Sequence, residues 1–121
     1  MKDIDVVLKS RMETIHRILD AEENYGDEYP DDVPYLHEFG LSVDEKADNI
    51  DYVAWVLSTG GPHEEIRFYL GYDIELQQSK PIKFTFAMMD WGEYEEKEIT
   101  KSEDKEALHE IFYRIYGGVR E

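Results

Sequence analysis

The sequence predicts an α+β fold: an antiparallel sheet of about four strands in a meander, with an N-terminal and a C-terminal helix packed on one face. Two observations carry this prediction. Apolar residues recur at helical spacing near both ends of the chain, and they alternate with polar residues through its middle. Turn signals separate the alternating runs, so successive strands are expected to pair as hairpins. The length of 121 residues fits one domain, residues 1–121.

Both predicted helices have recognisable ends. The first is expected over Ile4 to Glu23, where Asp3 can cap the start and Gly26 ends the pattern. The second follows Thr100-Lys101-Ser102-Glu103, which matches a capping box, and Gly117-Gly118 provides its stop. Helix and strand residues are expected to share one core, with these members: Ile15, Trp55, Phe68, Phe84, Phe86, Ile111 and Phe112.

Residues 24–49 form the least regular stretch. Pro30 and Pro34 break helices there. From Asp20 to Asp51 the chain has twelve acids and one base. Aromatic and aliphatic residues interrupt this acidic run, so we expect a pinned loop with a short strand or helix near Tyr35 to Val43.

Four strands are expected after this loop. Residues 52–59 are apolar at both odd and even positions, as in a central strand. In residues 65–77 and 82–89, apolar residues alternate with more polar ones. Gly71 marks a bulge or bend, and residues 93–99 read as a charged edge strand. The alternation assigns these residues to the buried face: Ile66, Phe68, Leu70, Tyr72, Ile74 and Leu76 in one strand, and Ile82, Phe84, Phe86 and Met88 in the next.

The charge of the chain is its most unusual property. Twenty-nine acidic residues against 13 basic ones give a net charge of -16, although 41% of the chain is hydrophobic. Direct nucleic-acid binding is not expected, because the basic residues form no stripe. The absence of cysteine excludes disulfides and thiolate chemistry. No apolar run is long enough for a membrane helix, and the N-terminus lacks a signal-peptide core.

Motifs for catalysis are scarce. The Gly60-Gly61-Pro62 segment is interpreted as a hairpin turn rather than a phosphate loop, because no P-loop lysine follows. His63, Glu64 and Asp90 would bind a metal only if their turns converged. We expect no metal, no cofactor and no enzyme activity.

The candidate partner-binding residues form two acidic clusters with aromatic neighbours. Carboxylates at such positions can engage arginine and lysine side chains that otherwise hold phosphates. The loop cluster comprises Asp27, Glu28, Asp31 and Asp32 with Tyr25, Tyr29 and Tyr35, and the strand cluster comprises Glu93, Glu95, Glu96 and Glu98 with Trp91. We interpret Trp91 as a plug at the end of the sheet, with an exposed interface anchor as the alternative. The loop is expected to matter more, because it combines charge with several aromatic anchors.

Two turn motifs carry a resemblance to known proteins. The strand ending in Ser58-Thr59-Gly60-Gly61-Pro62 and the strand ending in Met89-Asp90-Trp91-Gly92 resemble a pattern in small phage and mobile-element proteins. Such proteins often lie near anti-restriction and anti-CRISPR genes, and the match covers roughly Tyr52 to Ile99. The small, acidic, cysteine-free profile is also similar to that of DNA-mimicking inhibitors of bacterial defence nucleases. The resemblance assigns no functional residue.

These observations favour a non-enzymatic inhibitor acting in the cytoplasm of a host cell. It would dock on the basic nucleic-acid channel of a CRISPR effector or restriction enzyme and block engagement of DNA or RNA. One alternative is a structural protein, with a homodimer possible, whose acidity serves solubility. A third is a small metal-dependent hydrolase.

Overall fold

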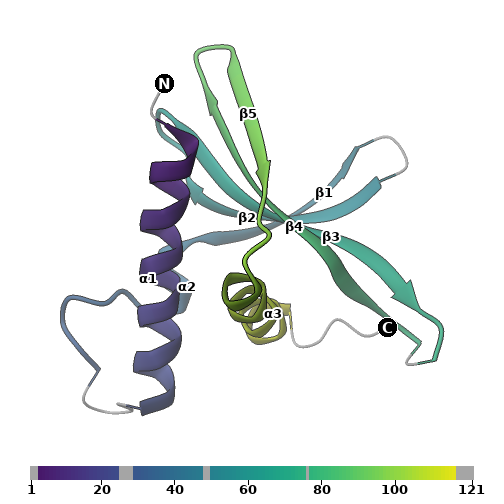
Figure 1. The fold of residues 1–121 in the computed structure, drawn as a ribbon, viewed down its shortest axis with the longest axis horizontal. Helices are drawn as coiled ribbons and strands as arrows, with labels where there is room; N and C mark the ends of the chain where they lie inside the picture. Colours follow the sequence, from purple (N-terminus) through teal and green to yellow (C-terminus); the bar gives the residue numbers. More distant parts are fainter. Residues whose placement is uncertain (1–2, 25–28, 48–49, 76, 117–121) are drawn as a thin grey trace.

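The computed structural model describes residues 3–24, 29–47, 50–75 and 77–116. Its elements follow the order α1 (Ile4–Asn24), α2 (Leu36–Phe39), β1 (Leu41–Ala47), β2 (Ile50–Ser58), β3 (His63–Asp73), β4 (Gln78–Asp90), β5 (Glu93–Glu98) and α3 (Ser102–Tyr116). The strands form one antiparallel sheet in the order β1-β2-β3-β4-β5 (Figure 1). The predicted α+β meander is therefore confirmed.

One strand more than the four expected is present. β1 lies in the acidic stretch for which only a short strand or helix was predicted, and α2 precedes it directly. The charged sequence of β1 shows no clear alternation of apolar and polar residues. The strand is defined instead by its pairing with β2, from Leu41 opposite Val56 to Ala47 opposite Ile50. β1 and β5 are the two edges of the sheet.

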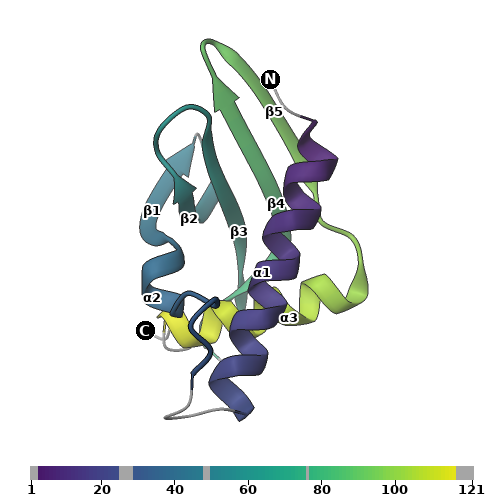
Figure 2. The same ribbon diagram turned by 90° about the vertical axis from the view of Figure 1, so that its left-hand side faces the viewer.

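Both long helices cover the same face of the sheet. Figure 2 shows α1 and α3 in front of the strands, with α3 crossing α1. The seven core residues expected from the sequence all belong to one buried cluster. Burial of Phe84 and Phe86 on this face confirms the predicted register of β4.

The helix ends agree with the sequence where the structure describes them. The Asp3 carboxylate accepts a hydrogen bond of 2.8 Å from the Asp5 amide, which caps α1. α3 begins slightly later than its predicted capping box, because Lys101 supplies the carbonyl that accepts the first helical bond, from Lys105 at 2.9 Å. The predicted stops at Gly26 and Gly117-Gly118 lie outside the described residues.

The predicted alternation is wrong near the turn between β3 and β4. The pairing runs from Tyr69 opposite Lys83 to Leu70 opposite Pro81, so Ile82 is an extra residue in a bulge. Ile82 is consequently 64% exposed. Gly71 lies beside this bulge, as its sequence position predicted, and a Cβ there would come 2.8 Å from Ile82.

Two further residues that the alternation assigned to the buried face are also exposed. Tyr72 and Ile74 are 64% and 79% exposed, and Leu76 lies outside the described residues. The hairpin extends beyond the helices in Figure 1, which explains the loss of cover. The helix-covered core therefore ends near Leu70, which still packs against it.

Candidate functional site

The turn between β4 and β5 places a tryptophan in solvent. Trp91 and Gly92 have φ angles of 51° and 86°, which the tight two-residue connection requires. Trp91 is 97% exposed. The interpretation of Trp91 as a core plug is therefore wrong, and the alternative of an exposed side chain is correct. The turn projects from the sheet far from α3, as Figure 1 shows.

The carboxylates of β5 divide between two faces of the strand. Glu93 and Glu95 share one face, while Glu96 and Glu98 share the other, because alternate strand residues point in opposite directions. Three of the four are exposed: Glu93, Glu95 and Glu98. Glu96 is only partly exposed. Glu96 differs from the other three because its carboxylate makes contacts within the chain.

Arg67 lies at the centre of the sheet face that the two long helices leave uncovered. Its guanidinium donates to Glu65 at 2.5 Å and to Glu96 at 3.1 Å. The same group lies 4.8 Å from the ring centre of Tyr52 and 5.6 Å from that of Tyr94. The side chain of Arg67 is 12% exposed, so paired charges and aromatic rings replace the water it gives up.

Glu96 is the acceptor that ties this network together. The hydroxyls of Thr85 and Tyr69 donate to it at 2.6 and 2.7 Å, and Tyr94 donates as well. Burial acts to raise the pKa of Glu96, but these hydrogen bonds and the charge of Arg67 bring it below its usual value. Burial and the bond to Glu96 raise the pKa of Tyr94 to about 12. Glu96 therefore serves the stability of the sheet and is poorly placed to meet a partner.

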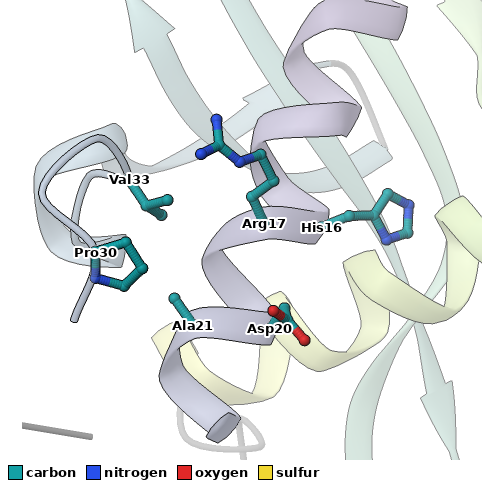
Figure 3. Close-up of a pocket in the computed structure, with 6 residues that line it drawn as sticks. All are labelled: His16, Arg17, Asp20, Ala21, Pro30 and Val33. Carbon is teal, nitrogen blue, oxygen red and sulfur yellow. The ribbon is translucent and has the colours of Figure 1, made fainter. Parts of the chain in front are cut away.

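The described part of the acidic loop packs against α1. Figure 3 shows Pro30 and Val33 facing Arg17 and Ala21 across a cavity of about 320 Å³. Arg17 bonds Asp32 at 2.5 Å, and this contact lowers the pKa of the Asp32 carboxyl. The loop is thus pinned, as the sequence predicted.

The described candidate residues of the loop differ in their contacts and exposure. The Tyr29 hydroxyl donates to the Pro34 carbonyl at 2.9 Å, and its ring stacks on Tyr35 with centres 4.5 Å apart. Asp31 and Tyr35 are exposed. The remaining candidates lie outside the described residues: Tyr25, Asp27 and Glu28.

Two histidines pair with carboxylates in different parts of the fold. His63 bonds Glu65 at 2.8 Å on the open face, whereas Glu64 points to the helices and accepts from Arg11 at 2.6 Å. His16 pairs with Asp104 at 2.9 Å, linking α1 to α3. Within residues 3–24, 29–47, 50–75 and 77–116, no three potential ligands come together to hold a metal ion.

Sequence reasoning missed the Arg67 network, although one signal was present. Glu65, Arg67 and Tyr69 share the polar parity of β3, so they had to lie on one face. Their partners on β4 and β5 depended on a register that no short motif specifies.

Comparisons with known proteins give no relative: no family model, no curated protein and no solved structure matches the chain. None of the described helices is long and apolar enough to cross a membrane.

Proposed function

We propose that this chain is a non-enzymatic inhibitor that docks on the basic nucleic-acid channel of a bacterial defence protein and keeps DNA or RNA out. The exposed indole of Trp91, beside the carboxylates of β5, is the observation that supports this function best. The choice of partner rests on the net charge of -16 and on the resemblance to DNA-mimicking inhibitors.

The tip of the β4–β5 hairpin combines the two features of a docking surface. Tryptophan is among the residues most enriched at the energetic centres of interfaces. Trp91 is 97% exposed, and Glu95 and Glu98, farther along β5, are exposed as well. A basic partner would be attracted by the carboxylates and would then bury the indole.

We prefer the hairpin to the loop as the docking surface. In the loop, Tyr29 and Asp32 are engaged within the chain. On the hairpin, nearly the whole of Trp91 is accessible to a partner. We therefore place the principal contact along the free edge of β5, with Trp91 at its turn and Glu95 and Glu98 on the two faces of the strand.

The test measures inhibition of DNA cleavage by a panel of CRISPR effectors and restriction enzymes. One variant carries Glu95→Gln and Glu98→Gln, and its control carries Glu103→Gln and Glu106→Gln at exposed positions of α3. Both variants lose two charges, so the net charge of the protein is the same in each. We expect inhibition to weaken in the hairpin variant and to persist in the control.

The Trp91→Ser variant and salt complete the test. Replacing Trp91 is expected to weaken inhibition at least about tenfold, since a binding hot spot is worth about 2 kcal/mol or more. Inhibition should also fall with salt, because exposed charges are screened beyond about 8–10 Å. The proposal fails if no enzyme in the panel is inhibited. It also fails if inhibition changes neither with salt concentration nor on replacement of Trp91.

A further inference from the structure

A cavity of about 650 Å³ lies where α1, α2, β2 and α3 meet. Figure 2 shows the end of α3 beside α2 at this place. Leu36 and Ile115 provide apolar walls, and Glu22 and Arg114 provide a polar one. Its volume is within the range of about 300–1,000 Å³ that is usual for small-molecule sites.

The indole N–H of Trp55 lies at the wall of this cavity. Trp55 is 1% exposed, and in the described parts of the chain no acceptor is hydrogen-bonded to its Nε1 atom. Gly40 also lines the cavity, and a Cβ at Gly40 would come 2.8 Å from that nitrogen. The N–H edge of the indole therefore borders the cavity. Buried donors are nearly always satisfied, so a donor left open beside a cavity indicates a missing acceptor.

The polar wall of the cavity determines the charge that a bound ligand can carry. Arg114 donates to Glu22 at 2.9 Å and to Glu110 at 2.8 Å, so its charge is already matched by two carboxylates. The chain as a whole is strongly negative. An anion would be repelled by this net charge, because the Arg114 cation of the cavity wall is already paired with two carboxylates.

We propose that this cavity binds a small ligand without negative charge, with an aromatic or aliphatic body and one carbonyl or hydroxyl oxygen that accepts the Trp55 indole hydrogen bond. The body would lie against Leu36 and Ile115. This site is separate from the hairpin that carries Trp91, so either proposal can fail without the other.

The test uses three probes of similar size on the intact protein: benzamide, toluene and benzoate. Benzamide has the acceptor without the charge, toluene lacks the acceptor, and benzoate adds a negative charge. NMR titration follows the two indole N–H signals, which the Trp91→Phe variant assigns. We expect a saturable downfield shift of the Trp55 signal with benzamide, and binding at least about tenfold weaker for toluene and for benzoate.

Two further measurements locate the site. The exposed indole of Trp91 is the internal reference and should not move. Ile115→Phe, which fills the apolar wall, should weaken benzamide binding while the Trp55 signal keeps its folded position. The proposal is overturned if benzamide leaves the Trp55 signal unmoved or shifts both indoles alike. It is also overturned if the three probes bind equally or Ile115→Phe binds benzamide as well as the parent protein does.

Discussion

Replacing Glu96 with glutamine tests whether the open face of the sheet depends on a charged acceptor. Glu96 accepts hydrogen bonds from Thr85, Tyr69, Tyr94 and Arg67. Hydrogen bonds to a charged group contribute about 1.5–3 kcal/mol, and glutamine sets an amide NH₂ against groups that donate. We expect Glu96→Gln to lower the free energy of unfolding by about 1.5–3 kcal/mol at pH 7.

The expected change in melting temperature follows from the length of the chain. Unfolding entropy is about 2.1 cal/mol/K per residue, or roughly 0.25 kcal/mol/K for a chain of this size. A loss of about 1.5–3 kcal/mol therefore lowers Tm by roughly 6–12 °C. Thermal and urea unfolding, followed by circular dichroism, measure both quantities.

The effect should depend on pH in a defined direction. The pKa of Glu96 is lowered in the folded chain, so its contribution is fully present above the unfolded value of about 4.3. The contribution is lost as pH falls through the lower, folded pKa. The difference between the parent and Glu96→Gln should consequently shrink in strong acid.

Glu98→Gln is the matched control for this prediction. Glu98 lies on the same strand and face, but it is exposed. Its replacement removes the same charge and should change stability by less than about 0.5 kcal/mol. Equal stabilities of the two variants at pH 7 would refute the structural role assigned to Glu96.

Two further predictions concern packing. Phe86→Ala should cost about 3–5 kcal/mol in urea unfolding, because the ring is fully buried, and a cost below about 1 kcal/mol would contradict this. Gly40→Ala should cost about 1–3 kcal/mol, because its Cβ would come 2.8 Å from the Val56 carbonyl, whereas Gly60→Ala meets nothing within 4 Å. Similar melting temperatures for the two alanine variants would show that the contact at Gly40 relaxes without cost.

The fold was predictable where local periodicity and packing agree. Phe84 and Phe86 alternate in the sequence and are buried under the helices, and Ile15 and Ile111 recur at helical spacing in the same core. Prediction failed where geometry overrides the pattern. Ile82 fits the apolar alternation of its strand, but the bulge exposes its side chain to solvent.

The candidate site was less predictable than the fold. Trp91 was identified as a residue of interest, but its exposure depends on how far the hairpin extends beyond the helices. Glu96 could not be distinguished from Glu95 and Glu98 by composition. Its distinct role follows from pairing that places Ala87 opposite Glu96 and sets Arg67 of β3 within reach.

The Arg67 network also bears on the cooperativity of the sheet. An edge strand such as β5 would ordinarily fray first, because backbone bonds hold it on one side alone. Here, detaching β5 also breaks the bonds from Glu96 to Tyr69 and Arg67 on β3, one strand beyond its neighbour. Detachment of β5 is thereby coupled to opening of the centre of the sheet. The edge strand that carries the exposed carboxylates of Glu93, Glu95 and Glu98 therefore keeps its shape until the sheet unfolds.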